Sequence, residues 1–354
     1  MATAAHWSQY FALRTLSATM QCFNVEENLR TVGAFGSVYS LLSAKRRGRA
    51  RMNIKRSFPR LSEDEANGLA EASIRNMFQI FAVDSLAMPE LLTHITWPDR
   101  VMVGEMDEVL PLLVKEEPAL FLTAHAGNWE VLGYFVSLLG FKMTALARPI
   151  DNPLINKWLL DLREQHGLKV LTKFGATQEV DKIIDDGGRV GFIADQNAGD
   201  KGLFIPFLGR MASSYKSIGL LAMRHQIPVV AGFAKRTPDQ FKYEIVITDI
   251  IRPDHWVDQP DPLFYISARF NRAVEQFVRL VPDQYLWVHR RWKSRPKWER
   301  EGKPMPSRMI AKLERLPWMT PTLLKRLQVN SAVDAGLEPM EKAYEVDLEP
   351  GEMP

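Results

Sequence analysis

Apolar residues follow two different periods along the middle of the chain. Between residues 118 and 250, short apolar runs alternate with stretches in which apolar residues recur every three to four positions. The short runs are typical of buried strands and the others of amphipathic helices. They predict strands at 119–124, 143–147, 168–171, 190–194, 229–233 and 244–248, and helices at 129–139, 155–165 and 178–185. This alternation predicts an α/β fold: a mainly parallel central sheet with helices on both faces.

The first 60 residues have a different pattern. Apolar residues recur at helical spacing up to Leu42, and Trp7, Tyr10 and Phe11 precede them. Seven cations without an anion among them follow: Lys45, Arg46, Arg47, Arg49, Arg51, Lys55 and Arg56. An apolar helix followed by cations is typical of an interfacial anchor on an anionic membrane surface. The alternative is a helix packed on the main domain and followed by a solvated basic loop.

Three segments follow from these patterns. Residues 1–60 form the N-terminal helical segment, and residues 61–300 form the α/β domain, which opens with a capping box at Ser62 and Glu65 and includes a helix at 264–280. Residues 301–354 form a C-terminal extension. Beyond about residue 330 it has seven acidic residues against one lysine, which predicts a disordered acidic tail.

Composition narrows the class of protein. The 354 residues have a formal charge of +3, 46% are hydrophobic, and Cys22 is the only cysteine. This excludes an intrachain disulfide and multi-cysteine metal sites, and it favours a reducing compartment. The longest uncharged N-terminal run is 14 residues, too short for a membrane span, and no signal peptide is evident. We therefore expect the protein at the cytoplasmic side.

The most informative motif follows the first predicted strand. Signatures of P-loop, dinucleotide-binding, serine-hydrolase and zincin sites are absent. What remains is His125-Ala-Gly-Asn128-Trp-Glu130. Ala126 and Gly127 permit a tight turn, Asn128 is a natural N-cap, and Glu130 would lie in the first helical turn. Glu130 could then orient the imidazole and leave its other nitrogen free as a general base. The alternative is a buried histidine that bonds a backbone carbonyl.

Other candidate residues follow later predicted strands. Arg148 should lie at the same edge of the sheet, where a guanidinium suits bidentate binding of a phosphate or acyl oxygen, or it could pair with Asp151. Arg163, on the next helix, could equally be structural. Asp195 and Gln196 could position Arg148 or a substrate headgroup, or simply cap a loop.

A late segment combines aromatic and basic residues. Residues 287–293 read Trp-Val-His-Arg-Arg-Trp-Lys. Alone, this could be a nucleic-acid surface. A lipid phosphate or an acidic carrier protein explains the same cations, and the aromatic residues could belong to the core. His289 is a packed or phosphate-contacting residue in this interpretation, not a second base.

Together these segments resemble the bacterial lipid A biosynthesis (late) acyltransferases of the lysophospholipid acyltransferase superfamily. The resemblance covers residues 45–300. It rests on the His125–Glu130 motif and on the following blocks: Asn53 with Phe58-Pro59 and Leu61-Ser62, Arg148-Pro149 with Asp151-Asn152-Pro153, Arg163 to Gly167, Asp195-Gln196, Phe204 to Phe207 with Gly209, and Tyr285 to Arg291.

The resemblance implies transfer of a fatty acyl group from an acyl-carrier-protein thioester to a hydroxyl of a lipid A precursor. His125 would be the general base and Glu130 its orienting partner, without cofactor or metal. Substrate contacts would come from Asn128, Arg148, Arg163, Asp195, Gln196, His289, Arg290 and Arg291. The expected location is the cytoplasmic face of the inner membrane, on the bilayer rather than across it. The alternatives are acyl-CoA-dependent acylation of another glycolipid, such as a phosphatidylinositol mannoside, and a non-catalytic lipid- or nucleic-acid-binding protein.

Overall fold

The computed structural model describes residues 2–165, 167–171 and 177–346. Two compact units make up the chain, and each contains several separate segments. Unit 1 comprises Met1–Val38, Arg75–Ile193 and Ile227–Ile250. Unit 2 comprises Tyr39–Ile74, Ala194–Gln226 and Ile251–Pro354. The three-segment boundaries expected from the sequence stay a prediction.

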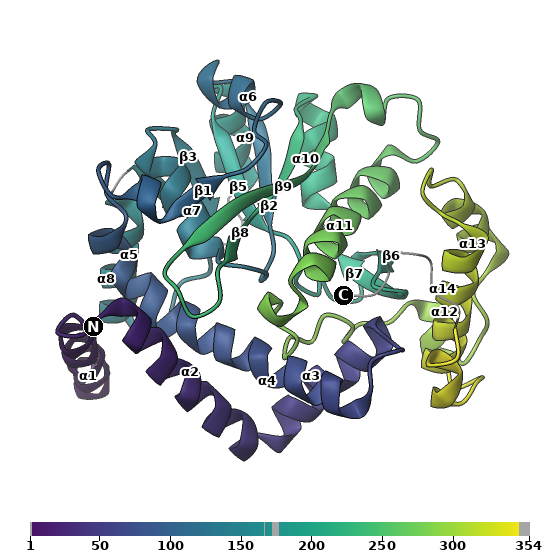
Figure 1. Cartoon of the computed structure of the whole chain (residues 1–354). Helices are drawn as coiled ribbons and strands as arrows, with labels where there is room; N and C mark the ends of the chain where they lie inside the picture. Colours follow the sequence, from purple (N-terminus) through teal and green to yellow (C-terminus); the bar gives the residue numbers. More distant parts are fainter. Residues whose placement is uncertain (1, 166, 172–176, 347–354) are drawn as a thin grey trace. The chain divides into compact units, whose positions relative to one another are not determined.

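Unit 1 contains the predicted parallel sheet. Its seven strands have the order β1-β9-β8-β2-β5-β3-β4 (Figure 1). The pairs β1–β9, β2–β8, β2–β5, β5–β3 and β3–β4 are parallel, which confirms the α/β prediction. The strands are β1 (Val101–Val103), β2 (Ala119–Thr123), β3 (Met143–Leu146), β4 (Leu168–Leu171), β5 (Arg189–Ile193), β8 (Val229–Arg236) and β9 (Tyr243–Ile251).

Helices alternate with these strands along the chain. They are α1 (Ala4–Met20), α2 (Val25–Leu42), η1 (Ile80–Asp84), α5 (Ser85–Leu91), η2 (Trp97–Asp99), α6 (Leu110–Val114), α7 (Trp129–Leu138), α8 (Pro153–Glu164) and α9 (Thr177–Asp185). For α7, α8 and α9, the ends predicted from the apolar periodicity agree with the observed ends to within two residues. Val131, Tyr134 and Phe135 of α7 join Tyr243 and Ile245 of β9 in one buried core. This burial fixes α7, and with it the turn that precedes the helix.

Unit 2 is built around helices and a short hairpin. The two hairpin strands, β6 (Leu203–Phe207) and β7 (Arg210–Ser214), are antiparallel and were not predicted. The predicted capping box is present: the Glu65 N–H donates to Ser62 Oγ at 3.2 Å, and the Ser62 N–H donates to Glu65 Oε2 at 2.7 Å. The helices are α3 (Ala44–Ser57), α4 (Glu63–Gln79, which continues into unit 1), α10 (Ser217–His225), η3 (Pro253–His255), α11 (Pro262–Leu280), η4 (Pro282–Gln284), α12 (Lys297–Arg300), α13 (Ser307–Glu314), α14 (Pro321–Asp334) and η5 (Met340–Ala343).

The prediction of a disordered tail from about residue 330 is wrong as far as residue 346. Helix α14 continues to Asp334, and the one-turn helix η5 follows. The Asp334 carboxylate is 9% exposed and accepts hydrogen bonds from Arg56, Arg210 and Arg295. At least one acidic residue of this segment, Asp334, is therefore buried in an ion-pair cluster and is not part of a solvated tail. Residues 347–354 lie outside the described part of the chain.

The basic segment forms helix α3 instead of a loop, and several of its cations bond inside the protein. Arg56 is 2% exposed and pairs with Asp334, so its assignment to a membrane surface is wrong. Arg49 donates to the carbonyl of Val288 at 3.2 Å, and Lys55 donates to that of Pro59 at 3.3 Å. The exposed members of the set are Lys45 and Arg46.

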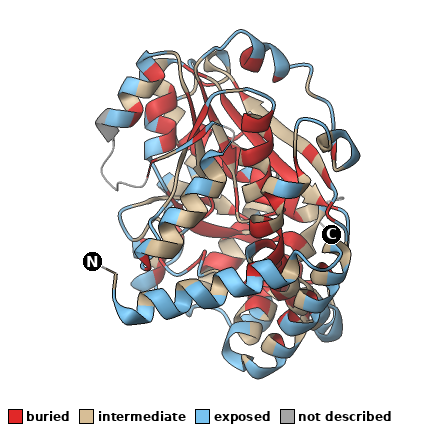
Figure 2. Cartoon of the chain, turned by 90° about the vertical axis from the view of Figure 1, so that its left-hand side faces the viewer, coloured by how far each residue is buried: buried red, intermediate tan, exposed pale blue. Residues whose placement is uncertain are grey.

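The N-terminal helices expose apolar side chains. On α1 the exposed fractions are 45% for Trp7 and 59% for Phe11, and on α2 they are 64% for Phe35 and 81% for Leu42. Figure 2 shows the helix that follows the N label mainly in the colour of exposed residues. No helix in the described ranges has both the length and the hydropathy needed to cross a membrane.

Candidate active site

The His125 motif forms a turn at the carboxyl end of β2. The strand ends two residues before His125. Gly127 has a φ of +60°, which glycine adopts without strain. The turn ends at Asn128, whose Oδ1 accepts hydrogen bonds from the backbone N–H groups of Glu130 and Val131 at 3.1 and 3.0 Å. Asn128 is therefore the N-cap of α7, as predicted from the sequence.

The imidazole of His125 is partly exposed and packs against one aromatic ring. It lies edge-on to Trp129, with 4.9 Å between ring centroids. Trp129 in turn lies edge-on to Phe81, with 5.8 Å between ring centroids. This packing restricts the orientation of the imidazole while leaving part of it accessible, which suits a side chain that exchanges a proton with a bound molecule.

A buried polar cluster lies beneath the turn, and the sequence analysis missed it. Asn128 Nδ2 donates to the Asp84 carboxylate at 2.6 Å, and Arg236 donates to the same oxygen of Asp84. The second side-chain contact of Asn128 Nδ2 is the Tyr243 hydroxyl at 3.3 Å. Asp84 is 0% exposed, and burial raises its pKa to about 6 against the opposing charge of Arg236. The sequence signal for this cluster is Asp84 itself, the one charged residue in the mainly apolar run 80–88. Carboxylates are rarely buried without a partner, so an aspartate in such a run indicates a buried polar contact.

Glu130 forms an ion pair with Arg163. Arg163 Nε donates to Glu130 Oε2 at 2.7 Å and Nη2 donates to Oε1 at 2.6 Å, a bidentate arrangement. Burial lowers the pKa of Arg163, but the carboxylate more than reverses this, so its pKa lies above the usual value. Both predicted residues thus lie beside the turn. The structure brings Glu130 together with Arg163, and its predicted contact with His125 stays a prediction.

Three predicted residues follow neighbouring parallel strands. Thr123 of β2 pairs with Ile193 of β5, and β5 also pairs with β3. His125, Asp195 and Arg148 are each the second residue after β2, β5 and β3 end. Carboxyl ends of parallel strands meet at one edge of a sheet, where α/β proteins bind ligands.

Arg148 has an exposed side chain. Among the residues that the structure describes, its guanidinium has no ion pair, so the alternative of a salt bridge to Asp151 does not hold. An exposed, uncompensated guanidinium after a strand is free to bind an anionic group.

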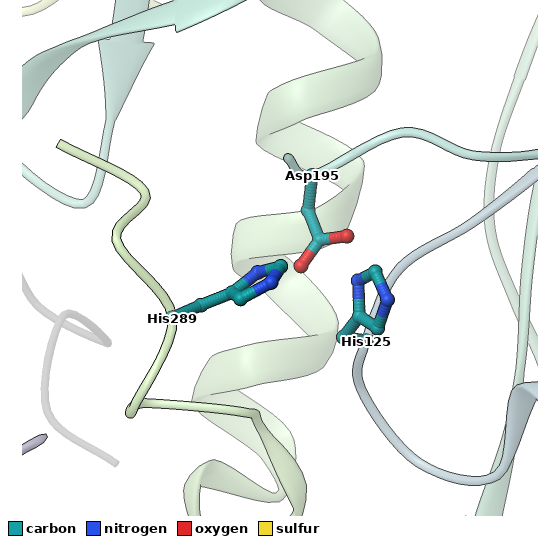
Figure 3. Close-up of side chains that lie close together, drawn as sticks. All are labelled: His125, Asp195 and His289. Carbon is teal, nitrogen blue, oxygen red and sulfur yellow. The ribbon is translucent and has the colours of Figure 1, made fainter. Parts of the chain in front are cut away.

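In unit 2, Asp195 lies beside His289. Asp195 is 0% exposed, and one of its carboxylate oxygens is within 4.8 Å of a ring nitrogen of His289. Figure 3 shows these two side chains pointing toward each other, with His125 drawn in the same view. Burial raises the pKa of Tyr285 well above its usual value, and the charge of Asp195 raises it further. Asp195 and His289 also offer the oxygen and nitrogen atoms that metal ions bind, but protein metal sites need further ligands.

The predicted basic segment at residues 287–293 divides into buried and exposed parts. Arg291 is 1% exposed and donates to Asn271 Oδ1 at 2.9 Å and to Ser214 Oγ at 2.6 Å, which gives it a structural role. Trp287 and Trp292 are 1% and 7% exposed. Buried rings cannot stack on bases, so this segment lacks the platform of a nucleic-acid surface. The exposed side chains at or near this segment include Gln196 and Arg290.

Comparisons with known proteins give a consistent result. The family model described as bacterial lipid A biosynthesis acyltransferase matches residues 5–294. A lipid A biosynthesis lauroyltransferase of Escherichia coli (strain K12) is 25% identical over 261 residues, which are 71% of this chain and 79% of the relative. A palmitoleoyltransferase and a myristoyltransferase of the same pathway and strain are 24% and 23% identical over 71% and 72% of this chain, and over 80% and 77% of their own lengths.

Proposed function

Because this chain belongs to the bacterial lipid A biosynthesis acyltransferase family, we propose that it transfers a fatty acyl group from an acyl-carrier-protein thioester to a hydroxyl of a lipid A precursor. Family membership makes it an acyltransferase. The observation that supports the site is the His125 turn at the carboxyl end of β2, with a partly exposed imidazole. Arg148 follows β3, which pairs with the same strand, β5, as β2 does.

In this proposal His125 acts as general base. One imidazole nitrogen takes the proton of the acceptor hydroxyl while its oxygen attacks the thioester carbonyl carbon. The new C–O bond forms, the C–S bond breaks, and the imidazolium returns its proton to the leaving thiolate. General-base catalysis of this kind contributes about 10²- to 10⁴-fold and requires no metal.

A carboxylate orients the imidazole in this proposal. Glu130 is the one expected from the motif, and its ion pair with Arg163 fixes its position in the first turn of α7. We propose that Glu130 orients the imidazole of His125, and that Arg163 holds Glu130 at the start of α7.

The donor and acceptor are tested with purified protein. Incubation with acyl-carrier-protein thioester and a lipid A precursor should give a product whose mass has increased by one acyl group. Acyl-CoA replaces the carrier in one arm, and a phosphatidylinositol mannoside replaces the acceptor in another. Transfer only from acyl-CoA, or only to the mannoside, would favour the alternative glycolipid reaction, and absence of any product would contradict the proposal.

We also propose that α1 and α2 bind the cytoplasmic face of the inner membrane through exposed apolar side chains. Replacing Phe11 and Phe35 with serine should lower binding to anionic vesicles at least tenfold, because each buried phenylalanine contributes about 1.5–3 kcal/mol. Replacing Lys45 and Arg46 with serine should weaken binding mainly at low salt. Met102→Ser is the matched control, since Met102 is 62% exposed on β1. Unchanged vesicle binding by the phenylalanine variant would contradict this surface.

A further inference from the structure

We propose that Asp84 is a positioning residue for the His125 turn, and that it acts through the side chain of Asn128. This inference rests on the proposed role of His125 as the base. Asp84 lies 41 positions before His125 in the sequence, and no motif includes it. All of the residues involved belong to unit 1.

Asn128 is fixed on every side. Its backbone N–H donates to the carbonyl of Ala234 on β8 at 2.7 Å, and its Oδ1 accepts the two N–H groups that begin α7. Its Nδ2 is left for Asp84 at 2.6 Å, with Tyr243 at 3.3 Å. The bond to Asp84 therefore sets which way the amide faces, since a flipped amide would place Oδ1 against a carboxylate.

Asp84 is in turn held by a strand that is distant from it in the sequence. Arg236 of β8 donates to Asp84, and Arg236 Nη1 also donates to Gln79 Oε1 at 3.2 Å. Asp84 ends the π-helical turn η1, which interrupts the helix that begins as α4 and continues as α5. Single π-helical turns are frequent at functional sites, because the extra residue redirects the side chains that follow.

A purely structural role explains less of this arrangement. Asp84 Oδ1 is buried and has no hydrogen-bond partner among the residues that the structure describes, so one of the two carboxylate oxygens is left uncompensated. Burial accordingly raises its pKa to about 6, while Arg236, Tyr243 and Asn128, the groups that face it, act against the rise. Buried ion pairs often stabilise a fold no better than apolar residues would. What Asp84 provides instead is a fixed orientation of the Asn128 amide. This amide caps α7 and so fixes the turn that begins at His125, three residues earlier.

The test uses Asp84→Ala, Asp84→Asn and the double variant His125→Ala/Asp84→Ala in the full chain. Asp84→Ala should lower kcat about 10- to 100-fold with KM within twofold, because a displaced base affects the chemical step. Asp84→Asn keeps an acceptor for Asn128 and should recover most of kcat. In the His125→Ala background, loss of Asp84 should have no further effect, since the two act as one unit.

Glu299→Gln is the matched control, because Glu299 is also a buried carboxylate paired with an arginine, in unit 2. It should lower thermal stability without changing the kcat of the folded enzyme. An unchanged kcat in Asp84→Ala, or an equal fall of kcat in Glu299→Gln, would overturn the inference. Both outcomes are comparisons with a wild-type enzyme that is active. They therefore differ from failure of the proposed function, in which the wild type itself transfers no acyl group.

Discussion

Replacing His125 with alanine should lower the rate of acyl transfer by about 10²- to 10⁴-fold, because the acceptor hydroxyl then loses its proton acceptor. Binding to vesicles and the unfolding transition should stay within error of wild type, since the imidazole is partly exposed and lies edge-on to Trp129. The measurement is the initial rate of product formation, followed by mass spectrometry. Unchanged transfer by the purified variant would contradict the mechanism.

Two controls sharpen this result. His94→Ala removes an exposed histidine of unit 1 and should retain full activity. The Asp195 carboxylate and the His289 ring nitrogens could bind a metal ion, so the assays are repeated after treatment with EDTA. Activity that is lost on chelation and restored by Zn²⁺ would contradict a metal-free general base.

Replacing Asp334 with alanine should destabilise unit 2 by about 3–5 kcal/mol, because it leaves three arginines without their shared anion. Burial, together with the charges of Arg56 and Arg295, lowers the pKa of Arg210 to about 9, and the Asp334 carboxylate opposes this fall. Urea unfolding measures the loss. Asp200→Ala is the control, since Asp200 pairs with Arg300 at the surface, and its removal should change stability by at most about 0.5 kcal/mol.

The same carboxylate has a defined pH dependence. Burial raises the pKa of Asp334, but Arg210, Arg295 and Arg56 outweigh burial and hold it below the usual value. The folded state then binds the proton less readily than the unfolded state. The stabilisation is complete above the unfolded pKa, about 3.9, and is lost as pH falls through the lower folded pKa. A wild-type acid transition that Asp334→Ala leaves unshifted would contradict this assignment.

Local sequence patterns predicted the elements that depend on neighbours in the chain. The strand before His125, the Asn128 cap and the Ser62 capping box each involve residues within a few positions of one another. Strand and helix periods therefore identified the sheet, and the motif that follows β2 supplied the residue proposed as the base, His125. The hairpin strand β6 was not predicted, because it contains Pro206, and proline is unfavourable in most strands except at the edge of a sheet.

Burial of charged residues could not be predicted in this way. Arg56 and Arg291 belong to runs of cations that are typical of surfaces, yet their partners lie 278 and 20 positions away. Asp84 likewise meets Asn128 across 44 positions. A charge becomes favourable inside a protein only when its partner arrives from elsewhere in the fold, and no local period contains that information.

The ion cluster at Asp334 also constrains the order of events during synthesis. Its four members emerge from the ribosome as Arg56, Arg210, Arg295 and finally Asp334. The stretch that matches the family ends at residue 294, before the last two are made. Arg56 and Arg210 therefore have no access to this shared anion until residue 334 has been translated. A nascent chain stalled near residue 300 would hold unit 2 in an open, chaperone-dependent state, whereas one that includes residue 334 and has cleared the exit tunnel could close it.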